Sequence, residues 1–540
     1  MTERSVSRWA LTATLGLILL GTGLRIAQFA HNRALWLDEA ALALQVLYKT
    51  PVELLGPLGW HQNSPLAFLL SVKAITVAFG TSDWALRALP ILSGVVSVLL
   101  FAILARMIAR PKDDAPLHPW TFGSMDRERW DIALVALALF AVSKHLLYYS
   151  SELRHYSTDV MLVCALYILT LWARDRRGRV MLLGVAGVIA TWFSLASIFV
   201  LGAIGATRVL FSLARRDWKR FAWGAGLSAV WLASFLIHLR IQSHNIAVRG
   251  LGPEIALHNS MSFMPMPPTS FADLKWFRET FDMMFYIPVG LTYRGLGGFA
   301  FLAGCITLWR QNRERAALLM LPFAFALFAS GLERYPFRDR YILFLAPCLI
   351  LLIAAGVGFL LDRKRLGTRL VGLVLFAMLF AQPLVHGLKV IAQPRGGYEI
   401  KPLLAHMQER WHEGDGVYVP LTAVPPFMLY APRMAFAPVA IPAHLYDQTG
   451  LDFVGLTEGQ VVLEPHRGEF LDEDEGFLKD FQDRELSALL ARSHSVWILF
   501  EHDAPLPIHT LVGEIDDIGR LLETTLSDGA SLYRYQSVDE

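Results

Sequence analysis

Long apolar blocks alternate with short polar loops over the first 390 residues of the chain. Each block has about 16–22 residues, which is the length that an α-helix needs to cross the hydrocarbon core of a bilayer. The pattern predicts a polytopic α-helical membrane protein with about eleven transmembrane helices. The predicted spans are 9–30, 88–108, 132–148, 157–173, 180–196, 199–214, 221–239, 290–309, 316–331, 341–361 and 369–390.

Basic residues gather in alternate loops between these spans. Clusters of Lys and Arg follow the second, fourth, sixth, eighth and tenth spans, at 106–129, 174–179, 215–220, 310–315 and 363–369. Cytoplasmic loops of membrane proteins carry such an excess of positive charge. The pattern therefore predicts a multi-pass protein of the inner (plasma) membrane with a cytoplasmic N-terminus.

One further apolar segment, 65–79, does not fit this alternation. It has only about fifteen residues and contains Lys73, and if it crossed the membrane every later basic loop would lie outside. We therefore predict a re-entrant or interfacial helix. Two large outer loops result, a first at 31–87 and a second at 240–288.

The composition changes near residue 393. The tail has an acidic run at 472–475 and ordinary polarity, with helical spacing at 399–412, 477–492 and 509–526. Short apolar runs at 416–420, 495–500 and 531–535 are typical of strands. The chain is thus predicted to have a transmembrane domain, 1–392, and a small extracytoplasmic α/β domain, 393–540.

The overall composition agrees with a membrane protein. Hydrophobic residues make up 54% of the chain and charged residues 18%, whereas soluble domains have about 25% charged residues. The net charge of +2 gives no sign of nucleic-acid binding. Cys164, Cys305 and Cys348 all fall inside predicted spans, so we expect packing residues rather than disulfides or a cysteine metal site. The block 9–30 carries Arg25 and lacks a clear cleavage site, which favours an uncleaved span over a signal peptide.

Two polar motifs lie in the first outer loop. Asp38 and Glu39 are adjacent acids just past the first span, and they are either a solvated loop end or a functional pair. His61 comes shortly before a predicted helix start, where Asn63 or Ser64 suits the cap and Pro65 suits the first position. The imidazole could bind phosphate or a metal, or be a plain surface histidine.

Two more motifs lie in later outer loops. Glu152, Arg154 and Tyr156 follow two tyrosines, which indicates either an aromatic belt at the interface or a sugar-phosphate site. Arg338 and Arg340 run against the positive-inside rule, and guanidinium groups bind phosphate oxygens in pairs, with structural salt bridges as the alternative. All four motifs are predicted on one side of the membrane, and this favours a joint functional role.

The order of these motifs resembles the membrane-embedded GT-C glycosyltransferases. The resemblance is to a bacterial branch related to protein O-mannosyltransferases and to polyprenyl-phosphate-sugar transferases that modify lipopolysaccharide, and it covers about residues 9–360. It rests on short motifs: Asp38-Glu39, His61…Pro65-Leu66, Arg87-Ala88-Leu89-Pro90, Glu152-Leu153-Arg154-His155-Tyr156, and Arg340-Tyr341 followed by Pro347. The family more often has two prolines after the His or Lys, and here there is one.

The resemblance implies an inverting sugar transfer from a polyprenyl-phosphate donor on the extracytoplasmic side. It implies that the first acid of the pair, Asp38, is the general base on the acceptor hydroxyl. The expected substrate-binding residues are Glu39, His61, Arg87, Glu152, Arg154, Tyr156, Arg338 and Arg340. Among them, the glutamates are candidates for sugar hydroxyls or a metal, and the histidine and Arg154, Arg338 and Arg340 for the phosphate. No cofactor is expected, because the spacing of the acids and His61 is not a metal signature. The expected partners are the lipid-linked donor, a glycan, lipid or protein acceptor, and membrane lipid, but no nucleic acid.

Two other functions fit the pattern less well. A lipid-linked sugar transporter or flippase should have charged residues in the middle of its spans and broken, repeated helices. A non-catalytic assembly protein of the cell envelope should tolerate replacement of Asp38, Glu39 and Glu152.

Overall fold

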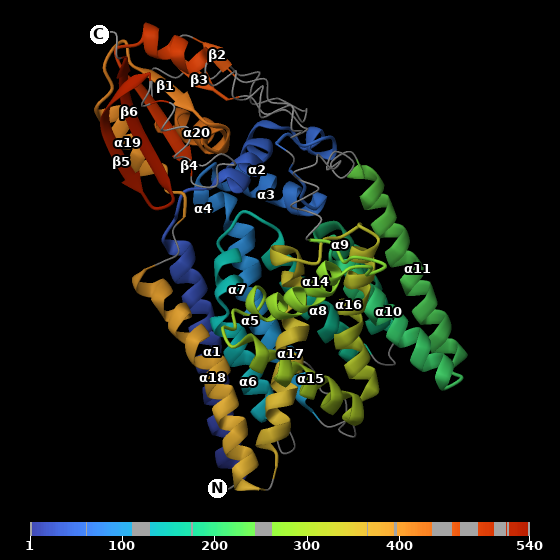
Figure 1. Cartoon of the computed structure of the whole chain (residues 1–540). Coiled ribbons are helices and arrows are strands. Elements are labelled where there is room, and N and C mark those ends of the chain that lie inside the picture. Colours follow the sequence, from blue (N-terminus) through green and yellow to red (C-terminus); the bar gives the residue numbers. More distant parts are fainter. Residues whose placement is uncertain are drawn as a thin grey trace. The chain divides into compact units, whose positions relative to one another are not determined.

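The structure, a computed structural model, divides the chain into two compact units, each built from segments far apart in the sequence (Figure 1). The first unit contains Met1–His31, Ala88–Arg240 and Asn259–Pro394, and the second contains Asn32–Arg87, Ile241–His258 and Arg395–Glu540. The residues that the structure describes are 3–60, 62–110, 130–173, 177–243, 262–363, 365–393, 397–434, 456–458, 460–464, 484–501, 515 and 518–537.

Helices make up the first unit. They are α1 (Glu3–Ala30), α5 (Ala88–Ala109), α6 (Trp130–Val142), α7 (Lys144–Tyr149), α8 (Tyr156–Trp172), α9 (Arg177–Phe193), α10 (Ser197–Ala214), α11 (Trp218–Ile241), α14 (Phe271–Tyr286), α15 (Arg294–Gln311), α16 (Arg313–Gly331), the 3₁₀ segment η2 (Asp339–Leu345), α17 (Ala346–Leu361) and α18 (Leu366–Ala392). A helix lies at each of the eleven predicted spans. Within the described residues, seven helices are long and apolar enough to cross a membrane, so the chain is an integral membrane protein, while the count of eleven crossings stays a prediction.

The predicted span 132–148 is divided in the structure. α6 ends at Val142 and α7 begins at Lys144, with Ser143 between them. The fully buried Arg25 of α1 donates to the carbonyl oxygens of Phe140 and Ala141, at 3.4 and 3.3 Å. Carbonyl groups in the last turn of a helix have no helical partner, so the guanidinium satisfies them. Arg25 therefore has a structural role at this break.

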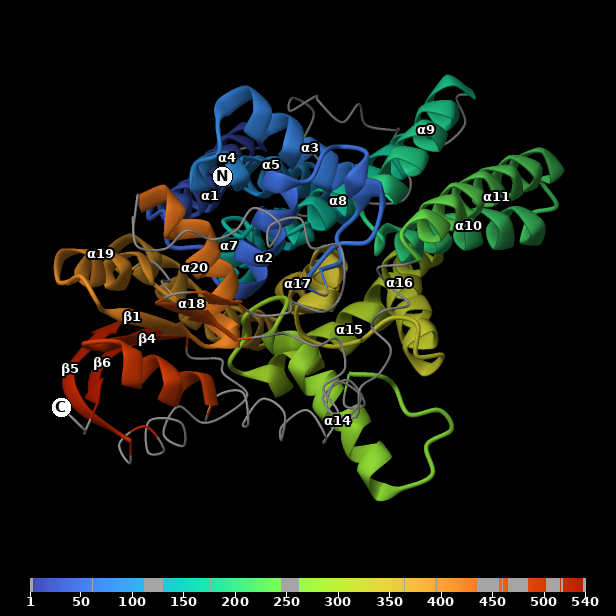
Figure 2. The same ribbon diagram turned by 90° about the horizontal axis from the view of Figure 1, so that it is seen from above.

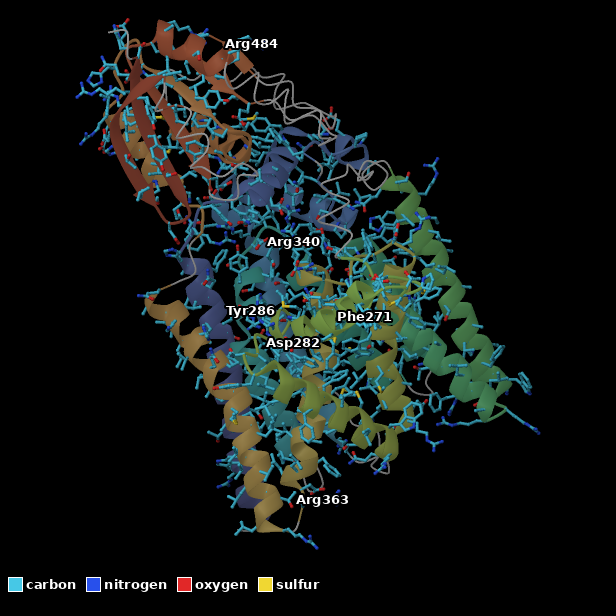
Figure 3. The ribbon with its side chains drawn as sticks, in the orientation of Figure 1. Phe271, Asp282, Tyr286, Arg340, Arg363 and Arg484 are labelled. Carbon is cyan, nitrogen blue, oxygen red and sulfur yellow. The ribbon has the colours of Figure 1, made fainter. Side chains whose placement is uncertain are left out.

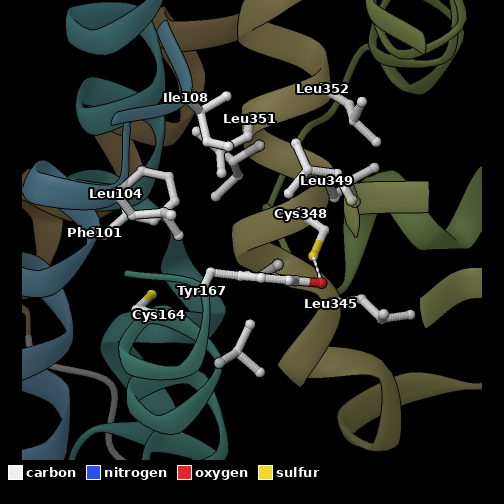
Figure 4. Packing of buried hydrophobic residues seen from close by; sticks show 14 of the residues in the cluster. Phe101, Leu104, Ile108, Cys164, Tyr167, Leu345, Cys348, Leu349, Leu351 and Leu352 are labelled. Atoms are coloured by element: carbon white, nitrogen blue, oxygen red, sulfur yellow. Dashed lines mark hydrogen bonds between the residues drawn. The ribbon is translucent and has the colours of Figure 1, made fainter. Parts of the chain in front are cut away.

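The core of the first unit is an apolar cluster that surrounds α17. Figure 4 shows part of it, where the Tyr167 hydroxyl lies near the Cys348 thiol, 3.5 Å from the sulfur. That hydroxyl donates to the Leu318 carbonyl oxygen at 2.7 Å. Cys164, Cys305 and Cys348 are all buried and free, as expected of packing residues.

α15 and α17 cross with their backbones in close contact. A Cβ atom on Gly304 would overlap the carbonyl oxygen of Leu352, and one on Gly356 would overlap that of Ala300. Small residues at such crossings let helix backbones approach, which is the usual way in which membrane helices gain packing contacts.

The first outer loop belongs to the second unit. It forms α2 (Leu37–Tyr48), the 3₁₀ turn η1 (Glu53–Leu55), α3 (Leu66–Phe79) and α4 (Asp83–Leu86). The apolar segment 65–79 is thus a helix of 14 residues, or about 21 Å, which is shorter than a bilayer core. Its membrane position stays a prediction.

The C-terminal part of the second unit contains a six-stranded mixed sheet in the order β2-β3-β1-β4-β6-β5. Figure 2 labels four of its strands, β1, β4, β5 and β6. Its strands are β1 (Gly416–Val419), β2 (Leu456–Glu458), β3 (Val461–Leu463), β4 (Val496–Glu501), β5 (Gly519–Ser527) and β6 (Ala530–Ser537). The helical elements are α19 (Lys401–Glu409), η3 (Leu421–Ala423), α20 (Val424–Tyr430), η4 (Pro432–Met434) and a helix over 484–492. β1 pairs in parallel with β3 and β4, and the other described pairs are antiparallel.

The three predicted strands at 416–420, 495–500 and 531–535 are confirmed as β1, β4 and β6. The prediction of a helix over 509–526 is wrong from Gly519 on, where β5 forms the edge of the sheet. A register irregularity between Leu521 and Glu523 lets two leucines stand side by side in a strand, and this pair disturbs the two-residue alternation that identifies strands. The predicted fold class, a polytopic helical protein with a small C-terminal α/β domain, is confirmed.

Candidate functional site

The acidic pair lies at the start of α2 in the second unit. Trp36 is in extended conformation before the helix, and Asp38 and Glu39 occupy its first turn. Carboxylates are favourable there because the first amide groups of a helix carry partial positive charge. Asp38 is half-buried and Glu39 is fully buried.

Two buried arginines hold the Glu39 carboxylate. Arg87 donates from Nε to Oε1 at 2.8 Å and from Nη2 to Oε2 at 2.6 Å, and Arg33 Nη1 lies 2.9 Å from Oε2. Burial alone would lower the pKa of Arg87, but the Glu39 carboxylate outweighs it and raises that pKa above its ordinary value. Arg87 therefore stays charged, and both oxygens of Glu39 are occupied by protein groups.

Arg87 also fixes the chain that leads to the acidic pair. Its Nη1 donates to the Arg33 carbonyl oxygen at 2.6 Å, and its Nη2 donates to that of Ala34 at 3.1 Å. A planar guanidinium suits this because its donors point in fixed directions. The structure thus brings together Glu39, Arg87 and Arg33. Sequence reasoning missed Arg33, although it is a basic residue at the outer end of a span, the same signal that singled out Arg338 and Arg340.

A second group of predicted residues meets in the first unit, between α7 and α8. Glu152 and Arg154 are buried in a tight turn in which the Arg154 amide donates to the Glu152 carbonyl oxygen at 2.6 Å. Tyr156 begins α8, and its ring centroid lies 5.2 Å from that of Tyr149. The Ser157 hydroxyl donates to the Tyr149 carbonyl oxygen at 2.8 Å and ties the two ends of the turn together.

Charged groups from two parts of the first unit act electrostatically on these tyrosines. Glu152, Arg154 and Arg340 lie close enough to act electrostatically on the Tyr156 hydroxyl. Burial and the Glu152 carboxylate raise the pKa of Tyr149, while Arg340 opposes them. Arg340, marked in Figure 3, belongs to η2, so a segment far along the chain contributes to this group. The arrangement combines hydrogen-bond donors with a half-buried cation, which suits a polar anionic ligand.

Arg338 lies two residues before Arg340, where it precedes η2. Its side chain is 40% exposed, and its Nε lies 3.6 Å from an Asp339 oxygen. The exposed fraction leaves the guanidinium accessible to a ligand. The surface contact with Asp339 contributes little to stability.

Sequence reasoning also missed a cation–aromatic group beside α14. Lys144 Nζ lies 3.7 Å from the ring centroid of Tyr286, and the Arg294 guanidinium carbon lies 4.6 Å from it. Arg294 also pairs with Asp282 at 3.1 Å. Tyr286 and Asp282 are marked in Figure 3. No local motif joins these residues, which come from the three helices α7, α14 and α15.

Two sequence predictions remain, the role of His61 and the question of a metal site. His61 lies outside the described residues, so its role stays a prediction. Among the residues that the structure describes, no group of three His, Cys, Asp or Glu side chains could hold a metal ion.

Comparison with solved structures relates the chain to known proteins. ArnT from Cupriavidus metallidurans in the apo state aligns over 97% of this chain and 98% of its own, with 12% identity and a TM-score of 0.50. ArnT from the same organism bound to undecaprenyl phosphate aligns over 96% and 98%, with 12% identity and a TM-score of 0.49. The Archaeoglobus fulgidus oligosaccharyltransferase, tethered with an acceptor peptide containing the NVT sequon via a disulfide bond, aligns over 75% and 58%, with 14% identity and a TM-score of 0.45.

No protein-family model matches the sequence. No curated protein matches it either. The fold is therefore the link to known proteins, and it extends over nearly the whole of both this chain and apo ArnT. The resemblance inferred from the motifs is confirmed at this level: the chain has the GT-C fold.

Proposed function

We propose that the chain is an inverting membrane glycosyltransferase that moves a sugar from a polyprenyl-phosphate donor to an acceptor hydroxyl on the extracytoplasmic side. The GT-C fold supports the transferase class, and the motif resemblance supports the donor class. The basic loops support an inner-membrane location with a cytoplasmic N-terminus and an extracytoplasmic C-terminal domain. The observation that carries the proposal is the acidic pair within this fold, where Glu39 is held by two arginines and Asp38 stands half-buried beside it.

The proposed reaction is one displacement at the anomeric carbon. The acceptor oxygen forms a bond to that carbon as its bond to the phosphate oxygen breaks, and the bonding electrons leave with the phosphate. The acceptor proton passes to Asp38, the general base. A lipid phosphate is already a good leaving group, so no strong acid is needed. A positioned base contributes about 10²–10⁴-fold to the rate.

The departing phosphate gains negative charge, which nearby cations stabilise. We assign this role to Arg154, Arg338 and Arg340, with His61 as a further candidate. Tyr156 and Glu152 lie in the same group as Arg154 and are assigned to polar groups of the donor. This assignment is supported by the position of Glu152, Arg154 and Tyr156, which are buried in and beside one turn.

Glu39 and Arg87 receive a different role from the one expected. The sequence resemblance implies that both bind substrate, but in the structure they bind each other, and Arg87 also binds the backbone. A substrate would have to displace buried ion pairs, which is costly. We therefore assign Glu39 and Arg87 to holding the start of α2.

The test is sugar transfer in proteoliposomes from a mixed pool of radiolabelled polyprenyl-phosphate sugars. Asp38→Asn keeps the shape of the side chain and removes the base, so we expect kcat to fall by about 10²–10⁴-fold. Glu53→Gln is the matched control, because Glu53 is an exposed acid of the same loop.

Full transfer by Asp38→Asn would place the base elsewhere. A folded wild-type protein that transfers no sugar from any donor would refute the transferase proposal. Movement of labelled donor across the membrane without transfer would favour the transporter function instead.

A further inference from the structure

The segment that leads to Asp38 is held by side chains from the C-terminal part of the second unit. Three of its amide groups donate to these side chains: Ala34 to Glu399 Oε1 at 2.8 Å, Leu35 to the Tyr430 hydroxyl at 2.8 Å, and Leu37 to Glu501 Oε2 at 3.2 Å. The three acceptors come from different elements, namely the start of the α19 segment, the end of α20 and the end of β4. The segment is therefore fixed from several sides and not by one flexible contact.

Side-chain packing adds to these hydrogen bonds. Ala34 and Leu35 are fully buried, and the Trp36 ring stacks on that of Tyr398 with centroids 5.7 Å apart. Burial raises the pKa of Tyr430, so its hydroxyl stays protonated and donates to Asp83 at 2.8 Å while it accepts from Leu35. Each partner of the Tyr430 hydroxyl belongs to the first outer loop.

The carbonyl groups of the same segment are fixed as well. The Arg87 guanidinium donates hydrogen bonds to the carbonyl oxygens of Arg33 and Ala34. Both amide and carbonyl groups of the segment therefore have defined partners. Asp38 follows directly, in the first turn of α2. The position of its carboxylate is therefore set in part by residues more than 350 positions later in the chain.

We propose that residues 395–540 are a positioning domain for Asp38, and that Glu399, Tyr430 and Glu501 fix the backbone that carries this acid. The catalytic part of this inference rests on the proposed function. Its physical basis is that a base displaced by about 1 Å costs on the order of 10²-fold in rate, even when substrate binding is unchanged. The three side chains are positioning residues, because they act through the backbone and not on the substrate.

The first experiment does not depend on activity. Tyr430→Phe removes the hydroxyl and keeps the ring, and we expect hydrogen exchange of the 34–37 amides to become at least about tenfold faster. Tyr533→Phe is the matched control, since Tyr533 packs on Phe500 within the sheet. Slow exchange in β4 and β6 of both variants would show that the domain remains folded. Unchanged hydrogen exchange of the 34–37 amides in Tyr430→Phe would overturn the proposal that the C-terminal part holds this segment.

The second experiment separates positioning from general structural damage. We expect Tyr430→Phe and Glu501→Ala to lower kcat about 10–100-fold with little change in the KM for the donor. Glu501→Gln keeps an acceptor oxygen for the Leu37 amide and should restore most of the loss. Faster exchange with normal kcat would overturn the positioning role. A wild-type protein that transfers no sugar would refute the proposed function, and the exchange result would still decide whether the domain holds the segment.

Discussion

At the scale of single residues, Arg87 both pairs with the Glu39 carboxylate and holds the backbone that leads to it. It donates to both oxygens of Glu39 and to two carbonyl oxygens, so four acceptors depend on one guanidinium. A lysine would carry the same charge, but its ammonium group has three donors that diverge from a single atom. The geometry therefore requires arginine and not merely a cation.

Arg87→Lys should accordingly destabilise the start of α2. The substitution removes the paired hydrogen bonds from Arg87 to the two oxygens of Glu39. We expect this loss to lower the free energy of unfolding by about 1.5–3 kcal/mol, the usual range for hydrogen bonds to charged groups. Faster hydrogen exchange of the α2 amides would measure it. Arg410→Lys is the control, since Arg410 is 56% exposed and pairs with Glu523 at the surface. An equal effect of the two variants would contradict the special role of Arg87.

A second residue-scale prediction concerns Asp273 at the start of α14. Ser270 and Asp273 form a capping box, and hydrogen bonds from the backbone amides of Thr269 and Ser270 lower the pKa of Asp273. A carboxyl whose pKa is lower in the folded state stabilises that state above its unfolded pKa, and the contribution is lost as the pH falls through the folded pKa.

Asp273→Asn should therefore fray the first turn of α14 at neutral pH. The difference from the wild type should shrink as the pH falls below about 4, the ordinary pKa of an Asp carboxyl, and it should disappear once the pH has fallen through the lower pKa of the folded Asp273. Hydrogen exchange of 271–275, corrected for intrinsic rates, measures the effect. If the difference in exchange between the wild type and Asp273→Asn does not change with pH, the charge of Asp273 does not contribute to the stability of the first turn.

At the scale of elements, the crossing of α15 and α17 depends on two glycines. Gly356→Ala would drive a Cβ atom into the Ala300 carbonyl group, so the helices must move apart. We expect a loss of about 1–3 kcal/mol, typical of an overpacked core, seen as a lower melting temperature in detergent. Gly295→Ala is the control, because no atom lies near its added Cβ. If both variants melt alike, the close crossing is not important for stability.

The sequence predicts elements well where apolar length alone selects them. Helices lie at all eleven predicted spans because long apolar runs have no other stable conformation in a bilayer. The break at Ser143 could not be predicted, since it is supported by Arg25 from another helix. β5 was mistaken for a helix because Leu521 and Leu522 are adjacent at an irregular point of the edge strand.

At the scale of the whole molecule, the second unit joins two parts of the chain that the sequence does not connect. The acidic pair could be found from its position after a span, but the pairing of Glu39 with Arg87 could not, because Arg87 is 48 residues away. The contacts of Ala34 and Leu35 with the C-terminal part span more than 360 residues. Each residue taken alone looks like a solvated loop residue, and only the fold brings them together.

Asp83 provides a test of whether the first outer loop and the C-terminal part of the second unit stabilise each other. It accepts hydrogen bonds from Tyr430 at 2.8 Å and Arg433 at 2.9 Å, and its Oδ2 lies 2.7 Å from Lys401 Nζ. Asp83→Asn leaves the two cations without their counter-charge, and we expect a loss of about 3 kcal/mol, the lower end for a broken buried pair.

Hydrogen exchange should then become faster in α4 and α20 together, while α15 and α17 remain unchanged. Glu523→Gln is the control, because it breaks a more exposed pair within the C-terminal part alone and should cost less than about 1 kcal/mol. A response of α4 without α20 would mean that the two parts are stabilised independently.

The division of the second unit between distant segments has a consequence for biosynthesis. Translation produces residues 32–87 more than 300 residues before it reaches Arg395. At about 5–20 residues per second, this interval lasts roughly 15–60 s. Throughout it, the nascent loop has already left the ribosome while its binding partner does not yet exist. The surroundings of the acid pair are thus completed only after translation has passed Glu501, and a polypeptide that stops before that point would carry Asp38 without all the groups that hold it in place.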